Sequence, residues 1–265
     1  MFYFKHYKKK TKLENKNHSC IVKTMKLPKK ITPCPIIEAV VEIRFNSTLP
    51  KETIIGLFYS KVKSELSAPR DMAIMKLPSD IREQDKNLQN QPYYEFRKEN
   101  LLVRLGPKVL VISNVKEYLG WQSFFSFIKK IVDYANSIEL ISSIERVGVR
   151  YINFFPENII GRLNVELKLN NELSNEKKVL VRIEDVEDNV TRVLNISNSA
   201  QMKKSGETAQ GTVIDIDCVQ SSIKDPISQS NIIDKIDIAH TMEKEYFYRI
   251  LTKDFIKTLN PEYED

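Results

Sequence analysis

Charged residues alternate with apolar residues in two segments whose pattern is typical of β-strands, residues 38–45 and 145–155. Their polar faces hold five charged side chains: Glu38, Glu42 and Arg44 in the first segment, Arg146 and Arg150 in the second. If the two strands are neighbours, the guanidinium groups can form forked hydrogen bonds with the carboxylates. These five residues are therefore the first candidate polar site.

Two interpretations of this set stay open. The ion pairs can form a structural charge lattice on an exposed sheet face, where opposite charges on neighbouring strands stabilise the pairing. Alternatively, the strands can form a groove in which one arginine is free for an anion or for a carboxylate of a partner. We favour the lattice.

A second candidate site is the pair Asp215 and Asp217, which share one face of a predicted strand between Val213 and Val219. Two carboxylates at this spacing can share a Mg²⁺ ion. With His240 nearby they could form a hydrolytic site. Alternatively, the aspartates lie on the solvent face of an ordinary strand, and His240 is a packed helix residue. For both features we favour this structural interpretation over a hydrolytic site.

Known catalytic motifs are missing from the sequence. The chain has seven glycines and no Gly-x-Gly, so it has no glycine-rich phosphate loop. It also lacks His-Glu-x-x-His, Cys-x-x-Cys and the nucleophile elbow. We therefore expect no cofactor, and we favour binding over catalysis.

The positive charge is concentrated at the N-terminus. The first 30 residues contain ten Lys and one acid, Glu14, so the rest of the chain has 31 basic and 34 acidic residues. Residues 1–30 are expected to be a poorly ordered basic tail that binds nucleic acid weakly and without specificity. The remainder lacks the basic surface of a nucleic-acid-binding domain.

Composition also limits the setting of the protein. No apolar run approaches the roughly 20 residues that span a bilayer, so we expect no membrane insertion. The three cysteines, at positions 20, 34 and 218, are too few and too scattered for a disulfide framework or a zinc finger. A cytoplasmic location fits this cysteine usage best.

The elements that must position these residues follow from periodicity and from turn residues. The pattern predicts helices at 50–68, from Trp121 to Ala135 and near 231–259. It also predicts two polar loops, at 80–92 and at 201–211. The loop at 80–92 is expected to be a flap. Strands are predicted at 38–45, 73–77, 93–98, 101–105, 109–113, 145–155, 162–169, 179–186, 190–197 and 212–220.

Short connections between these strands exclude a chain of parallel crossovers. We therefore predict an α+β fold, with a largely antiparallel sheet and helices on one face. Each half of the chain gives a strand, a meander and a helix, which suggests two similar lobes. The predicted division is a tail at 1–30, an N-terminal lobe at 31–158 and a C-terminal lobe at 159–265.

The segment Pro-Ile-Ile-Glu-Ala-Val-Val-Glu-Ile-Arg-Phe at 35–45 resembles the opening motif of a sporadically distributed, uncharacterised family of prokaryotic conserved hypothetical proteins. Gly-Pro-Lys-Val at 106–109, Tyr-Leu-Gly-Trp at 118–121 and Glu-Arg-Val-Gly-Val-Arg-Tyr-Ile-Asn at 145–153 are similar to its other motifs. Ala239 stands before His240 where the family has Leu. The resemblance covers roughly residues 33–260 and implies no known reaction.

The patchy distribution of that family implies an accessory or defence-type locus. On this basis we expect a non-enzymatic protein-binding or regulatory module, whose partner is a protein that a neighbouring gene encodes. A homodimer is compatible with the sequence. The alternative is a metal-dependent nucleotide- or nucleic-acid-processing enzyme that uses Asp215 and Asp217.

Overall fold

One large antiparallel sheet forms the centre of the protein. The computed structural model describes residues 26–169, 172–173, 177–204, 207–221 and 229–264. Nine strands pair in the order β2-β3-β4-β5-β1-β6-β11-β10-β9, and the small β7-β8 pair lies apart. The strands are β1 (Ile36–Asn46), β2 (Arg70–Asp71), β3 (Tyr94–Lys98), β4 (Leu101–Gly106), β5 (Val109–Val115), β6 (Ser143–Phe155), β7 (Lys168–Leu169), β8 (Glu172–Leu173), β9 (Leu180–Glu187), β10 (Val190–Lys204) and β11 (Glu207–Ser221).

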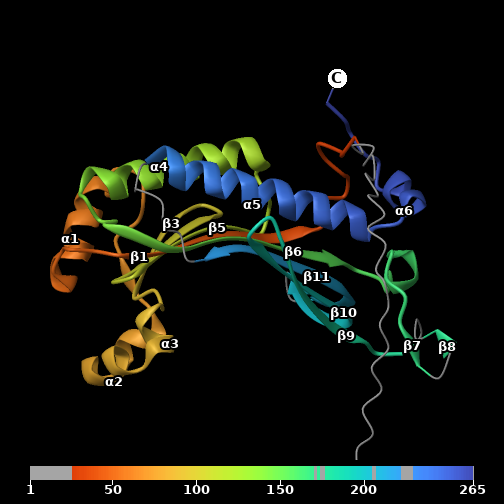
Figure 1. Cartoon of the computed structure of the whole chain (residues 1–265), viewed down its shortest axis with the longest axis horizontal. Coiled ribbons are helices and arrows are strands. Elements are labelled where there is room, and N and C mark those ends of the chain that lie inside the picture. Colours follow the sequence, from red (N-terminus) through yellow and green to blue (C-terminus); the bar gives the residue numbers. More distant parts are fainter. Residues whose placement is uncertain (1–25, 170–171, 174–176, 205–206, 222–228, 265) are drawn as a thin grey trace, which may run out of the picture.

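Helices α1 (Lys51–Val62), α4 (Trp121–Ser137) and α5 (Gln229–Ile250) lie on one side of this sheet (Figure 1). Helix α4 turns an apolar stripe inward, because Phe124, Ile128 and Ala135 recur at helical spacing and are fully buried. They pack on the alternate strand residues Val41, Ile43 and Val149. The α+β fold with a largely antiparallel sheet is thus confirmed. None of the described helices is both long and apolar enough to cross a membrane.

The two halves of the chain place their strands in the same order. In the first half, β1 pairs with β5, the last strand of the meander β3-β4-β5, and α4 follows. In the second half, β6 pairs with β11, the last strand of the meander β9-β10-β11, and α5 follows. The antiparallel pair β1 and β6 joins the halves, so strands of both predicted lobes form one continuous sheet.

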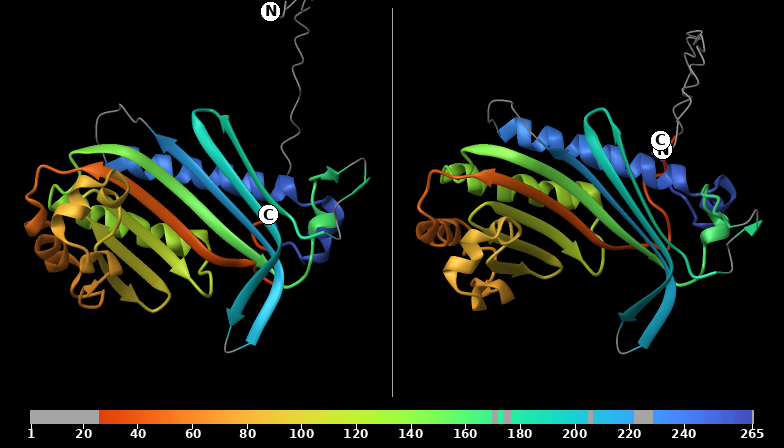
Figure 2. Two further views of the ribbon diagram at one scale, coloured as in Figure 1. Left: turned by 90° about the horizontal axis from the view of Figure 1, so that it is seen from below. Right: turned by 60° about the horizontal axis from the view of Figure 1, so that its bottom comes forward.

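On the opposite side of the sheet, the helices that the structure describes cover one end. The short helices α2 (Ser79–Gln84) and α3 (Lys86–Gln89) lie there, below the end that holds β3. Seen from that side, β1, β6 and β11 pass in front of α4 and α5 with no described helix over them (Figure 2). This uncovered region is where the polar faces of the central strands point.

Several predicted loops and strands were wrong. Residues 80–92 are not a loop but contain α2 and α3, and the Asp85 carboxylate caps α3 by accepting a hydrogen bond of 2.7 Å from the Asn87 amide. Of the loop predicted at 201–211, residues 201–204 and 207–211 belong to the outer part of the paired strands β10 and β11, and residues 205–206 lie outside the described residues. That part is polar because it projects beyond the apolar core (Figure 2).

Other element boundaries also differ from the prediction. Residues 73–76 form a short 3₁₀ helix instead of a strand. Of the strand predicted at 162–169, Lys168–Leu169 is a strand and Leu163 forms an isolated bridge with Leu251, whereas Ile160–Arg162 is a 3₁₀ turn. The helix predicted near 231–259 is interrupted, so that α6 (Lys253–Thr258) is separate, with the Thr252 hydroxyl capping it.

Contacts with the body begin within the tail predicted at residues 1–30. Pro28 and Ile31 are buried, and the amide of Lys29 donates a 2.6 Å hydrogen bond to the carbonyl of Glu262. The chain therefore joins the body through its C-terminal segment before β1 starts. The tail prediction for residues 1–25 lies outside the described residues.

Candidate functional site

The strand register brings both candidate sets together on one face. In the β1-β6 pair, Arg44 lies opposite Arg146 and Val40 opposite Arg150. In the β6-β11 pair, Arg150 lies opposite Asp217, and Asp215 is two residues away on the same face. We call the surface formed by Glu38, Glu42, Arg44, Arg146, Arg150, Asp215 and Asp217 the open face.

Arginines of the central strand β6 link its two neighbours. Arg146 donates from Nη1 to Glu42 Oε1 on β1 and from Nη2 to Asp217 Oδ2 on β11, the latter at 3.2 Å. Arg150 binds Asp215 with two parallel hydrogen bonds, Nε to Oδ1 at 2.7 Å and Nη2 to Oδ2 at 2.8 Å. Such forked pairs fix both side chains in one geometry.

The local electrostatics follow from this pairing and from partial burial. The hydrogen bonds to Asp215 raise the pKa of Arg150. Burial raises the pKa of Asp217, although the positive charges of Arg146 and Arg150 oppose that shift. Asp217 is therefore easier to protonate than an ordinary aspartate, and the two guanidinium groups limit that effect.

The network continues toward the edge of the sheet. Asn195 on β10 donates a 3.3 Å hydrogen bond to Asp215 Oδ2. Its own Oδ1 accepts one of 3.3 Å from Arg182 on β9. The polar side chains therefore form two hydrogen-bonded groups that lie side by side. One joins Arg44, Glu42, Arg146 and Asp217 on β1, β6 and β11. The other joins Arg150, Asp215, Asn195 and Arg182 on β6, β11, β10 and β9.

The arrangement combines the two interpretations of the sequence. Arg146 and Arg150 are each held by two hydrogen bonds to carboxylates, as in a lattice. Arg44 uses only Nε, which donates a 2.7 Å hydrogen bond to Glu42. Within the described residues its two terminal nitrogens have no hydrogen-bond acceptor at bonding distance. Arg44 is thus held less tightly than Arg146 and Arg150, and both of its terminal nitrogens can donate to a further carboxylate.

The metal site at Asp215 and Asp217 stays a prediction. In the described ranges, no group of three or more His, Cys, Asp or Glu is placed to hold a metal ion. A divalent ion would have to displace the guanidinium groups of Arg150 and Arg146. His240 cannot complete this site, because it belongs to α5 on the other side of the sheet, where its ring lies next to Tyr151.

His240 occupies a packed position. Its ring stacks on Trp121 with centroids 3.6 Å apart, and 8% of the residue is exposed. Burial and the nearby charge of Lys244 lower the pKa of His240 to about 3, so the imidazole is neutral. Its Nδ1 is buried and has no hydrogen-bond partner in the described part of the chain.

Sequence reasoning missed a buried acid, Glu243 of α5. Only 4% of it is exposed, and burial raises the pKa of this carboxyl to about 8. The signal was present, since Glu243 follows Ala239 and precedes Phe247 by four residues each, which places it on the inner stripe of the helix. It faces the same region as Tyr118 and Tyr151, whose hydroxyls share a 2.9 Å hydrogen bond.

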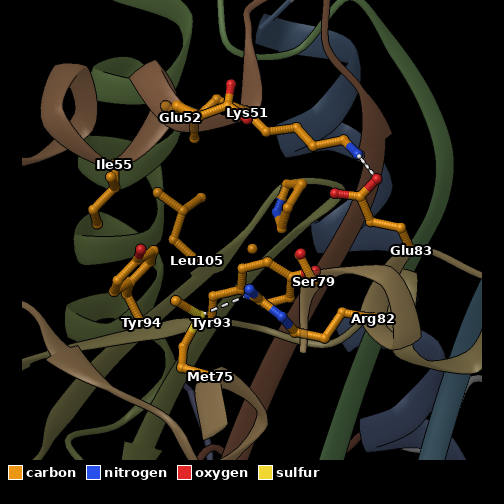
Figure 3. Close-up of a pocket in the computed structure, with 13 residues that line it drawn as sticks. Lys51, Glu52, Ile55, Met75, Ser79, Arg82, Glu83, Tyr93, Tyr94 and Leu105 are labelled. Atoms are coloured by element: carbon orange, nitrogen blue, oxygen red, sulfur yellow. Dashed lines mark hydrogen bonds and ion pairs between the residues drawn. The ribbon is translucent and has the colours of Figure 1, made fainter. Parts of the chain in front are cut away.

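A pocket of about 200 Å³ between α1, α2 and the β3-β4 hairpin was also missed (Figure 3). The Arg82 guanidinium lies 4.8 Å above the centre of the Tyr93 ring, and its Nη1 is 2.9 Å from Met75 Sδ. An ion pair of 3.2 Å between Lys51 and Glu83 ties α1 to α2 at the rim. The segment predicted as a flap is therefore fastened to the body.

Comparison with known proteins adds no assignment. No protein-family model and no curated protein matches this chain. The resemblance at residues 35–45 therefore stays a prediction. The proposal for the function therefore rests on the seven residues of the open face.

Proposed function

We propose that this chain is a non-enzymatic module that binds a partner protein through the open face. The observation that carries the proposal is the position of Arg146, which joins Glu42 and Asp217 across three strands on an uncovered region of the sheet. Charges held in this way keep a fixed pattern before any partner arrives.

The balance of charges favours a protein over a nucleic acid. The open face has three arginines and four carboxylates, so it offers no excess of positive charge to phosphates. Mixed charges in a fixed pattern are suited to a partner surface of complementary pattern, where they determine specificity and association rate. Side chains that are already ordered also lose less conformational entropy on binding.

Arg44 and Glu38 are the contact points that we propose for the partner. The terminal nitrogens of Arg44 can donate to a carboxylate of the partner. Glu38 is partly exposed and makes no ion pair within 4.0 Å among the described side chains. One donor and one acceptor at opposite ends of the β1 segment would set the orientation of the partner.

Three further parts of the proposal rest on the sequence. We propose that the chain belongs to the uncharacterised prokaryotic family that its motifs resemble. The partner is then the product of a neighbouring gene in an accessory or defence-type locus. The complex would form in the cytoplasm, which agrees with the free thiols of Cys34 and Cys218.

The test is capture of the partner by the full chain, followed by titration of the purified partner. Arg44→Glu and Glu38→Lys should each weaken binding at least tenfold, and the affinity of the unaltered chain should fall with added salt. Lys129→Glu, on α4 at the other side of the sheet, is the matched control and should bind normally. Equal binding by all variants, or no partner at any salt concentration, contradicts the proposal.

A further inference from the structure

The outer strand β9 has one paired edge and one free edge. It pairs with β10, and no other described strand lies on its outer side. Unpaired edges of this kind are usually protected by charges, bulges or a covering element. In β9, however, Leu180 is 81% exposed and Val186 70% exposed.

The hairpin geometry determines which backbone groups point outward. Glu187 lies opposite Val190, and the two-residue turn Asp188-Asn189 has positive φ at both positions. In such a hairpin the pair that closes the turn is hydrogen-bonded, so Glu187 and every second residue before it face β10. The N–H and C=O groups of Leu180, Arg182, Glu184 and Val186 therefore point away from the sheet.

We propose that β9 pairs with β9 of a second copy of this chain, antiparallel and with Ile183 opposite Ile183 of that copy. In this register Arg182 lies opposite Glu184, and Leu180 lies opposite Val186. All four are outward-facing residues, so each facing pair exchanges two backbone hydrogen bonds. The side chains of both pairs lie on the same face of the joined sheet, and they match charge to charge and apolar to apolar.

Charge selects this register over the neighbouring ones. A two-fold axis at Arg182 places Arg182 opposite Arg182, and an axis at Glu184 places Glu184 opposite Glu184. Like charges directly opposite each other destabilise an antiparallel pair. An odd-numbered shift would set outward groups against inward ones and lose the backbone hydrogen bonds.

Existing bonds of Arg182 are compatible with the added pairing. In one chain it donates to Asn195 Oδ1 at 3.3 Å and to Glu184 Oε2 at 3.2 Å. A guanidinium group has five N–H donors, so it can also donate to Glu184 of the second copy. The two arginines and two glutamates then alternate in sign around the two-fold axis.

The dimer would extend the sheet without covering the proposed binding face. Nine strands from each copy would form one continuous antiparallel sheet. Because the two-fold axis runs perpendicular to that sheet, both open faces point to the same side. This inference is independent of the proposed function, since β9 lies outside the seven residues of the open face.

A charge swap tests the register. Sedimentation of the full chain should give a dimer, and Arg182→Glu or Glu184→Arg alone should weaken it at least tenfold by placing like charges opposite each other. The double variant, Arg182→Glu with Glu184→Arg, should restore the dimer to within about threefold, because the pairs are opposite again. Lys61→Glu on α1 is the control and should leave the dimer unchanged.

A disulfide tests the same register directly. In a background with Cys20→Ser and Cys34→Ser, Ile183→Cys should give a covalent dimer on oxidation, since a non-hydrogen-bonded pair brings its Cα atoms to about 4.5 Å. Arg182→Cys should not form this covalent dimer. Position 182 lies opposite position 184 of the second copy, so the two introduced cysteines would be two residues out of register. A monomeric chain, a dimer insensitive to both single charge variants, or a double variant that stays monomeric while folded by circular dichroism would overturn the proposal.

Discussion

Trp121 of α4 stacks on His240 of α5, with ring centroids 3.6 Å apart and planes at 16°. The helix that follows the first meander thus contacts the helix that follows the second meander directly. Trp121 also donates from Nε1 to Asp237 at 3.3 Å, so it holds α5 at two neighbouring turns.

Replacing this indole should weaken the contact between the two helices. We expect Trp121→Ala to lower the free energy of unfolding by about 2 kcal/mol, less than for a fully buried aromatic residue. Urea denaturation followed by circular dichroism measures it, because Trp121 is the single tryptophan and fluorescence is lost with it. Trp121→Phe keeps an aromatic ring on His240 and should lose less than half as much. Equal losses would show that stacking does not join the helices.

Glu243 should make the protein less stable at alkaline pH. The pKa of its carboxyl is 4.5 in its ordinary state and about 8 in the folded chain, so the folded state binds the proton more tightly. The contribution of this carboxyl to the free energy of unfolding is fully present below pH 4.5 and is lost as the pH rises toward 8. His240 is neutral in the folded chain, and its titration in the unfolded chain around its ordinary pKa of 6.5 changes the stability of a Glu243 variant and of the unaltered chain equally.

Glu243→Gln removes this dependence because an amide does not titrate. Between pH 6.5 and 8 the unaltered chain should lose roughly 1–2 kcal/mol of unfolding free energy relative to the Gln variant. Thermal melts across that range measure the difference. Parallel curves for the two proteins would mean that the folded chain does not release the Glu243 proton between pH 6.5 and 8, which contradicts the prediction.

The Arg150–Asp215 pair should show measurable coupling in a double-mutant cycle. We expect about 1 kcal/mol between Arg150→Gln and Asp215→Asn, above a typical surface pair because the bond is forked and Asp215 is only 8% exposed. The exposed pair Lys257 and Asp254 is the control, where we expect no measurable coupling. Similar values in the two cycles would argue against a rigid open face.

Gly211 should not tolerate a side chain. A Cβ atom there would overlap the carbonyl oxygen of Phe155 and approach the Phe154 ring to 2.9 Å. Gly211→Ala should therefore cost more than about 3 kcal/mol of unfolding free energy, since backbone atoms must move. Gly56→Ala in α1 has open space around it and should stabilise by about 0.5–1 kcal/mol. Chemical denaturation of both variants distinguishes a blocked site from a general intolerance of alanine.

The periodicity of apolar residues was sufficient to predict the strands and helices that bury one face. The alternation in residues 38–45 identified β1 and both of its faces, and the apolar stripe from Trp121 identified α4. It was not sufficient where polar residues form regular structure by local bonds. Helices α2 and α3 and the outer β10-β11 hairpin have no buried stripe, and hairpin pairing such as Gln201 opposite Gln210 leaves no apolar pattern.

The candidate site depended on strand order, which composition does not reveal. Arg146 and Glu42 were grouped on the assumption that their strands are neighbours, and β1 and β6 do pair. Asp217 was assigned to a separate site because nothing in the sequence indicates that β11 flanks β6. Glu243 was overlooked because a single acid in an otherwise amphipathic helix is usually solvated.

The position of the central strand β6 also has a consequence for the folding of the chain during translation. Its two neighbours, β1 and β11, lie far before and far after it in the chain. A ribosome adds about 5–20 residues per second, so several seconds pass between the emergence of β6 and that of β11. For that time the nascent chain presents one edge of β6 without its native neighbour. Protection of this single edge, by a chaperone or by the tunnel exit, should decide how much of the newly made protein escapes aggregation.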